Sequence, residues 1–135
     1  MKILVIDAQG GGLGRQLIIE IRQQLPEAHI MAVGTNSMAT AAMLRAGADE
    51  AATGENPVVV ASRRADVIVG PIGIVLADAM LGEVTEKMAL AVAKSGAEKV
   101  LIPFNQCGTV IVGAAGSANE LIGKAVNEVK RIAGG

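Results

Sequence analysis

The stretch KILVIDAQGGGLGR, residues 2–15, places an apolar run of strand length, an acidic residue and four glycines directly ahead of a helical pattern. Glycine lets the backbone turn sharply and bring its N–H groups close to a ligand. The N-terminus of the helix that follows adds roughly half a positive charge. A strand, a glycine loop and a helix in this order form a cradle for a phosphate group, so the stretch predicts a nucleotide site.

Further apolar runs of strand length alternate with helical patterns along the rest of the chain. Most are continuously apolar, which is typical of strands that are covered on both faces. The expected strands are Lys2–Ile6, His29–Val33, a weak one near Asp49–Ala52, Val67–Val69, Lys99–Ile102 and Thr109–Val112.

Capping residues and breakers mark where the helices between these strands begin and end. Three expected helices run from the glycine loop to Pro26, from Asn36 or Ser37 to Gly47, and from Thr85 to Gly96. Three more are expected to begin at Asn56, with Pro57 in the first turn, after Gly70-Pro71, and at the capping box formed by residues Ser117 to Glu120.

This alternation predicts an α/β fold: one Rossmann-like, doubly wound domain over residues 1–135, with helices on both faces of the sheet. Right-handed crossovers favour a mostly parallel sheet of five to six strands in the order 3-2-1-4-5. Only residues 104–108 separate the last two expected strands, which is too short for a parallel crossover. The last strand, Thr109–Val112, is therefore expected to be antiparallel.

Composition narrows the classes of partner. Twelve basic and thirteen acidic residues give a net charge of −1, with no Tyr or Trp, so we expect no nucleic-acid partner. The longest uncharged apolar stretch, Val67–Ala77, is far shorter than the roughly 20 residues of a membrane span, so no membrane partner is expected. The start of the chain does not resemble a signal peptide and there is a single cysteine, which favours a cytoplasmic location.

Ligands of doubly wound domains bind at the carboxyl ends of the strands. In this sequence the loops at those ends are rich in glycine and small polar residues, whereas the loops at the opposite ends are ordinary turns. The candidate ligand-binding residues are Asp7, Gln9, Gly10, Gly11, Gly12, Leu13, Gly14, Thr35, Asn36, Ser37, Glu55, Asn56, Gly70 and Pro71.

The usual reactions of such a loop are not supported. Gln9 stands where a dinucleotide fingerprint needs its first glycine, and Ala8 stands where the loop of short-chain dehydrogenases has one. The tyrosine of those dehydrogenases is missing, as are an acidic residue at the end of the second strand and the Gly-Lys-Ser/Thr of a P-loop. No catalytic residue is assigned, and the cofactor is left as a nucleotide or dinucleotide of unknown identity.

Asp7 allows two functional interpretations and a structural one. It could coordinate Mg²⁺ or bind an amine or hydroxyl of a ligand, or it could accept N–H groups of its own loop. Asn105 and Cys107 are further polar residues after a strand, but the only histidine, His29, lies at the opposite end of the sheet, so a Cys-His pair is not expected. One cysteine and one histidine also make no zinc site.

The region Ile72–Val92 carries more apolar side chains than one sheet face should need, which favours a homo-oligomer interface over a wholly buried helix. Asp78, Glu83 and Glu86 in this region are expected on a solvated face.

Four segments, residues 5–14, 34–40, 52–56 and 70–75, together resemble a family of short bacterial Rossmann-like proteins known only as a domain of unknown function. The resemblance covers nearly the whole chain and implies the fold, but no reaction. Where that family has Asp-Gly-Gln, this chain has Asp7-Ala8-Gln9.

Three hypotheses follow. The first is a protein that binds a nucleotide or another phosphorylated small molecule without catalysis. The second is an enzyme that uses Asp7 with a divalent metal, or Asn105 and Cys107. The third is a homo-oligomeric interaction module whose glycine loop is purely structural.

Overall fold

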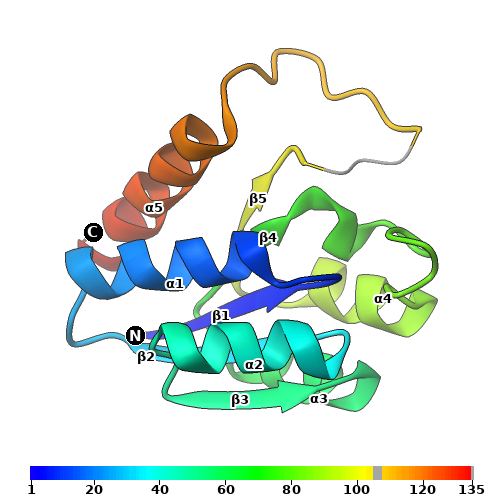
Figure 1. The fold of residues 1–135 in the computed structure, drawn as a ribbon, viewed down its shortest axis with the longest axis horizontal. Helices are drawn as coiled ribbons and strands as arrows, with labels where there is room; N and C mark the ends of the chain where they lie inside the picture. Colours follow the sequence, from blue (N-terminus) through cyan, green and yellow to red (C-terminus); the bar gives the residue numbers. More distant parts are fainter. Residues whose placement is uncertain (105–107, 135) are drawn as a thin grey trace.

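The computed structural model describes residues 1–104 and 108–134. It contains a five-stranded, all-parallel sheet in the order β3-β2-β1-β4-β5, which confirms the predicted class and strand order (Figure 1). The strands are β1 Lys2–Asp7, β2 His29–Gly34, β3 Glu50–Thr53, β4 Val67–Pro71 and β5 Glu98–Ile102.

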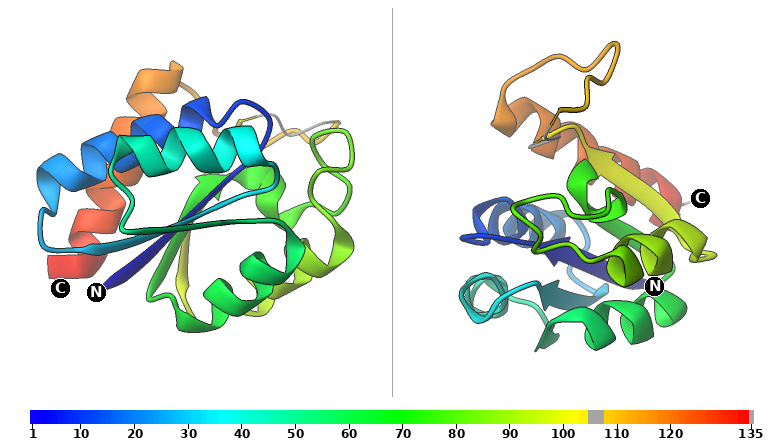
Figure 2. Two further views of the ribbon diagram at one scale, coloured as in Figure 1. Left: turned by 60° about the horizontal axis from the view of Figure 1, so that its bottom comes forward. Right: turned by 90° about the vertical axis from the view of Figure 1, so that its right-hand side faces the viewer.

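Helices cover both faces of the sheet (Figure 2). One face packs against α1, α2 and α5, and the other against α3 and α4. The helices are α1 Gly12–Gln24, α2 Ser37–Ala46, α3 Glu55–Arg64, the short 3-10 helix η1 Ile72–Val75, α4 Glu86–Lys94 and α5 Ala118–Gly134.

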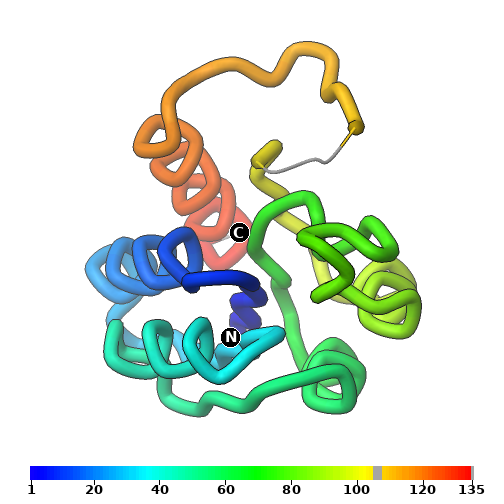
Figure 3. Tube along the Cα trace, turned by 45° about the vertical axis from the view of Figure 1, so that its right-hand side comes forward, coloured from blue at the N-terminus to red at the C-terminus, as the bar shows by residue number. Residues whose placement is uncertain are grey.

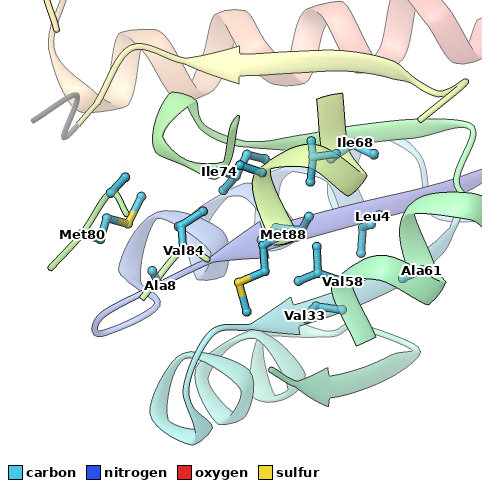
Figure 4. Packing of buried hydrophobic residues seen from close by; sticks show 14 of the residues in the cluster. Leu4, Ala8, Val33, Val58, Ala61, Ile68, Ile74, Met80, Val84 and Met88 are labelled. Carbon is cyan, nitrogen blue, oxygen red and sulfur yellow. The ribbon is translucent and has the colours of Figure 1, made fainter. Parts of the chain in front are cut away.

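Successive residues of β1 point into two different apolar cores. Ile3 and Val5 pack on the α1 side, whereas Leu4 and Ile6 pack on the side of α3 and α4, where Figure 4 shows Leu4 among its neighbours. All four side chains are at most 2% exposed. Burying one such side chain contributes about 1.5–3 kcal/mol, which explains why the strand is continuously apolar.

The predicted sixth strand, Thr109–Val112, is wrong. The segment lies outside the sheet (Figure 3), and the last strand of the sheet, β5, is parallel to β4. Val110 and Val112 are 86% and 95% exposed. Gly108 and Gly113, with φ of 76° and 84°, interrupt extended backbone at both ends of the segment. Strand-forming residues make a strand only where a sheet edge and a packing surface are available.

Two helix predictions need correction, and three caps are confirmed. The helix expected after Gly70-Pro71 is only the single turn η1, followed by irregular turns. Helix α3 begins at Glu55 after Gly54, so Asn56 is inside the helix and does not cap it. The caps that the sequence predicts at Asn36, Thr85 and Ser117 accept the amides of Ala39, Met88 and Glu120, respectively.

The core takes up most of the apolar side chains of region Ile72–Val92. Ile74, Met80, Val84, Met88 and Val92 are all at most 5% exposed, because they pack in the core on the side of α3 and α4. Leu81 and Leu90 remain exposed, at 98% and 57%. In the described part of the chain, no helix is both long and apolar enough to cross a membrane.

Candidate functional site

The first three strands end side by side at the same edge of the sheet, as parallel strands must. The amide of Thr35 donates to the carbonyl of Asp7 at 3.1 Å, and the amide of Gly54 donates to the carbonyl of Gly34 at 2.9 Å. These bonds join the loops after β1, β2 and β3, so the carboxyl edge is one continuous surface.

Asp7 closes the glycine loop on itself. Its Oδ1 accepts the amide of Ala8 at 2.8 Å and its Oδ2 accepts the amide of Gly14 at 2.7 Å. The side chain is buried, and this burial raises the pKa of Asp7; the two amide hydrogen bonds oppose the rise, and the charge of Glu83 adds to it. Each carboxylate oxygen thus accepts an amide of the protein's own loop, as the structural interpretation of Asp7 expects.

The four glycines of the loop have two different roles. A Cβ at Gly11 would lie 2.7 Å from Cα of Ala39, and a Cβ at Gly14 would lie 2.6 Å from Sδ of Met43, so both glycines permit close packing against α2. Gly11 also has φ of 76°. A Cβ at Gly10 or Gly12 would meet nothing within 4 Å. These two positions face open space.

Within the described part of the chain, three amides of the loop have no acceptor and are therefore available to a ligand. No residue that the structure describes accepts a hydrogen bond from the backbone N–H of Gly10, Gly12 or Leu13. Gly12 and Leu13 form the first turn of α1, where the helix dipole favours negative charge.

Glu83 lies over this loop, although the sequence suggested a solvated face for it. Its Oε1 accepts three hydrogen bonds, from the amide of Gln9 at 2.9 Å, the hydroxyl of Thr35 at 2.6 Å and Nδ2 of Asn36 at 2.8 Å. The bond from Thr35, and after it those from Gln9 and Asn36, lower the pKa of Glu83. Gln9 adopts φ of 52° at this contact, and its carbonyl accepts from the same Asn36 nitrogen.

A signal for Glu83 exists in the sequence, but it is weak. The residue follows Gly82 in the long connection after β4, and β4 ends at the same edge as β1. An acid beside a glycine in such a connection can fold back over the edge, but nothing in the residue order specifies which loop it reaches.

The remaining candidates lie elsewhere. Glu55 accepts the hydroxyl of Thr85 at 2.5 Å, and with Asn56 it lines a groove of 660 Å³ between α3 and α4. Gly70 and Pro71 are buried inside β4, where a Cβ at Gly70 would clash with the carbonyl of Ile6. Ser37 is exposed at the start of α2.

The described residues do not form a cluster of metal ligands, and the hypothesis of a metal at Asp7 stays a prediction. Among residues 1–104 and 108–134, no three His, Cys, Asp or Glu side chains are placed to hold a metal ion. His29 starts β2 and pairs with Glu50 at 2.5 Å, at the end of the sheet opposite the glycine loop. Asn105 and Cys107 lie outside the described residues, so their proposed roles stay predictions.

Comparison with known proteins gives a fold neighbour and a family. A crystal structure described as a dodecameric FMN-dependent Ubix-like decarboxylase from Escherichia coli O157:H7 is similar to this chain, with a TM-score of 0.50 and 16% sequence identity. The match covers 99% of this chain and 94% of that one, and it shows the Rossmann-like fold. No curated protein matches the sequence. The sequence model of one family matches residues 2–134, so the chain belongs to the family described as "Domain of unknown function (DUF3842)".

Proposed function

We propose that this protein binds a nucleotide or a related phosphorylated small molecule at the carboxyl edge of the sheet. The observation that carries the proposal is the set of free amides at Gly10, Gly12 and Leu13, beside open space at the two glycines. Backbone N–H groups at the start of a helix are a suitable site for a phosphate, because they combine donors with a favourable dipole. The fold neighbour is described as FMN-dependent, and FMN carries such a phosphate.

The sugar or base of the ligand would lie toward the second loop. Thr35 and Asn36 are partly exposed there, and Ser37 is exposed in the first turn of α2. Hydroxyl and amide side chains can bind a ribose hydroxyl or a base edge, and they can equally bind an oxygen of a phosphate that extends from the glycine loop. Glu55 and Asn56 belong to the groove between α3 and α4, so they contribute only to a ligand that reaches beyond β3.

Binding without catalysis is the form of this function that the contacts favour. Both acids near the loop already hold hydrogen-bond donors: Asp7 holds the amides of Ala8 and Gly14, and Glu83 holds three donors. Asp7 is in addition buried, with each oxygen on an amide of its own loop, so it is poorly placed to act as a general base or a metal ligand. A sensor or regulatory subunit fits these properties better than an enzyme using Asp7.

Self-association is a second proposal, with less support. Leu81 and Leu90 are the large apolar side chains of region Ile72–Val92 that stay exposed, and the fold neighbour is described as dodecameric. Light scattering tests it: a mass above 13.7 kDa that falls on Leu90→Glu supports an interface on α4. A monomer at all concentrations contradicts it.

A matched pair of glycine variants tests ligand binding. Gly12 and Gly123 are both helical glycines where a Cβ would meet nothing within 4 Å, but only Gly12 lies at the proposed site. FMN, ATP, NAD and inorganic phosphate are titrated against each variant by thermal shift and calorimetry. We expect binding to the wild type and to Gly123→Ala, and weaker binding to Gly12→Ala. No binding of any of these probes at millimolar concentration contradicts the proposal.

A further inference from the structure

We propose that Glu83 is an internal latch: its carboxylate occupies the place where an acidic group of the ligand binds, and it must swing out for the ligand to enter. This inference rests on the proposed function. It adds a way in which the site is regulated: the acidic group of the ligand competes with the carboxylate of Glu83.

The carboxylate of Glu83 is held by donors from two loops. One carboxylate oxygen collects a backbone amide from Gln9, a hydroxyl from Thr35 and an amide nitrogen from Asn36, all within 2.6–2.9 Å. These donors come from the loops after two different strands, and they converge on one point in space. Charge-assisted bonds of this kind are about twice as strong as neutral ones. The donors therefore form an anion site, and the anion in it belongs to the protein.

The charge of Glu83 also opposes the binding of an anionic ligand. With Glu83 in place, the glycine loop lies beside two carboxylates, since the charge of Glu83 acts on Asp7. A phosphate that approaches the amides of Gly12 and Leu13 is repelled by this pair. Once Glu83 has left, the donors of Gln9, Thr35 and Asn36 in the loops after β1 and β2 are free as well, which suits a group with several anionic oxygens. A ligand phosphate and the Glu83 carboxylate thus compete for the same hydrogen-bond donors.

The segment that carries Glu83 is anchored on both sides of this residue. Met80 and Val84 on either side are 3% and 1% exposed, packed in the core that contains Ala8 (Figure 4). The amide of Glu83 donates to the carbonyl of Met80 at 3.2 Å, which fixes the backbone. Glu83 itself is only partly buried and follows the exposed Gly82. Release therefore needs only a side-chain rotation, and the buried anchors can stay in place.

The segment is also under backbone strain. Asp78, Met80 and Leu81 have φ of 66°, 57° and 59°, in the left-handed region that disfavours residues other than glycine. Strain of this kind persists only where surrounding contacts hold the segment, and it is typical of clamps and switches. Here the contacts that hold it are the buried anchors and the three bonds to Glu83.

The test compares Glu83→Ala with Glu86→Ala in titrations with inorganic phosphate and with nucleoside monophosphates, followed by calorimetry and amide chemical shifts. Glu86 is an exposed acid three residues further on, in the first turn of α4, so its removal changes the net charge equally. We expect Glu83→Ala to bind phosphate-bearing probes about tenfold more tightly than the wild type. Without the carboxylate, the site is open to the ligand in a larger fraction of the molecules, and the apparent affinity rises with that fraction. Glu86→Ala should stay close to the wild type.

Glu83→Gln is a second variant, for the case that Glu83→Ala does not fold. It keeps the shape of the side chain and should also raise the affinity for phosphate-bearing probes. Suppose that the wild type binds and that a folded Glu83→Ala or Glu83→Gln variant binds equally or more weakly. Glu83 then either contacts the ligand or has no effect on its binding. In that case the latch is wrong, while the proposed function stands. If neither the wild type nor any variant binds, the proposed function fails, and the latch fails with it.

Discussion

The backbone amide of Gly14 lies 2.7 Å from Oδ2 of Asp7, seven residues earlier, and donates a hydrogen bond to it. This bond closes the glycine loop, and it depends on the missing side chain of Gly14, because a Cβ there would lie 2.9 Å from Cβ of Asp7. The first two residues to test are therefore the two ends of this bond.

Asp7→Asn should lower the free energy of unfolding by about 1–3 kcal/mol, the usual cost of leaving a buried donor without an acceptor. An asparagine offers one acceptor oxygen for the two amides of Ala8 and Gly14, and its NH₂ group faces the other amide. Urea unfolding measures the loss. Asp66→Asn is the control, since Asp66 is exposed and its side chain accepts the amide of Lys2. Equal effects of the two substitutions would mean that Asp7 does not hold the loop.

Gly14→Ala should destabilise the protein by about 1–3 kcal/mol, the typical cost of an overpacked core. The new methyl group would meet Sδ of Met43 at 2.6 Å. Gly12→Ala, two residues earlier, should leave stability unchanged or raise it slightly, because nothing lies within 4 Å of its Cβ. Thermal unfolding of both variants checks the prediction, and a stable Gly14→Ala would show that α1 and α2 are packed less closely.

Glu83 should make stability depend on pH in the acid range. Its hydrogen bonds to Thr35, Gln9 and Asn36 lower its pKa below the ordinary value of 4.5. A lowered folded-state pKa contributes stability above the unfolded value, and this contribution is lost as the pH falls through the folded value. The stability deficit of Glu83→Gln should thus be present at pH 7 and shrink below pH 4.5. A deficit that is the same at both pH values would contradict these bonds.

Asn36→Ala should cost about 1 kcal/mol or more, because the Asn36 side chain caps α2 through the amide of Ala39. Asn36→Ser keeps a capping oxygen but loses the bonds from Nδ2 to the carbonyl of Gln9 and to Glu83. We expect Asn36→Ser to be closer to the wild type in stability. If it is as unstable as Asn36→Ala, the contacts with Gln9 and Glu83 outweigh the cap.

Much of the fold could be predicted because single residues and short runs determine it. The continuously apolar strand β1 is buried on both faces, and the capping residues Asn36 and Thr85 mark where α2 and α4 begin. The strand order follows from the handedness of crossovers. The false strand at residues 109–112 shows the limit, since its composition favours a strand but no edge of the sheet pairs with it.

The candidate site could be predicted only in part. The order of strand, glycines and helix locates the loop. The sequence also allowed the interpretation that Asp7 accepts N–H groups of its own loop. The packing roles of Gly11 and Gly14 could not, because they depend on Ala39 and Met43 of a later helix. The contact of Glu83 with Gln9, 74 residues apart, depends on irregular turns that leave no periodic pattern.

The most direct test of the account is a titration of the ¹⁵N-labelled protein with FMN and with inorganic phosphate, followed by the backbone amide signals. If the free amides bind phosphate, the signals of Gly10, Gly12 and Leu13 shift in a saturable way, while that of Gly123 in α5 stays in place. The signal of Gln9 shifts with them, because Glu83 leaves its amide. Shifts confined to the groove between α3 and α4, or no saturable shift at the glycine loop, would contradict the account.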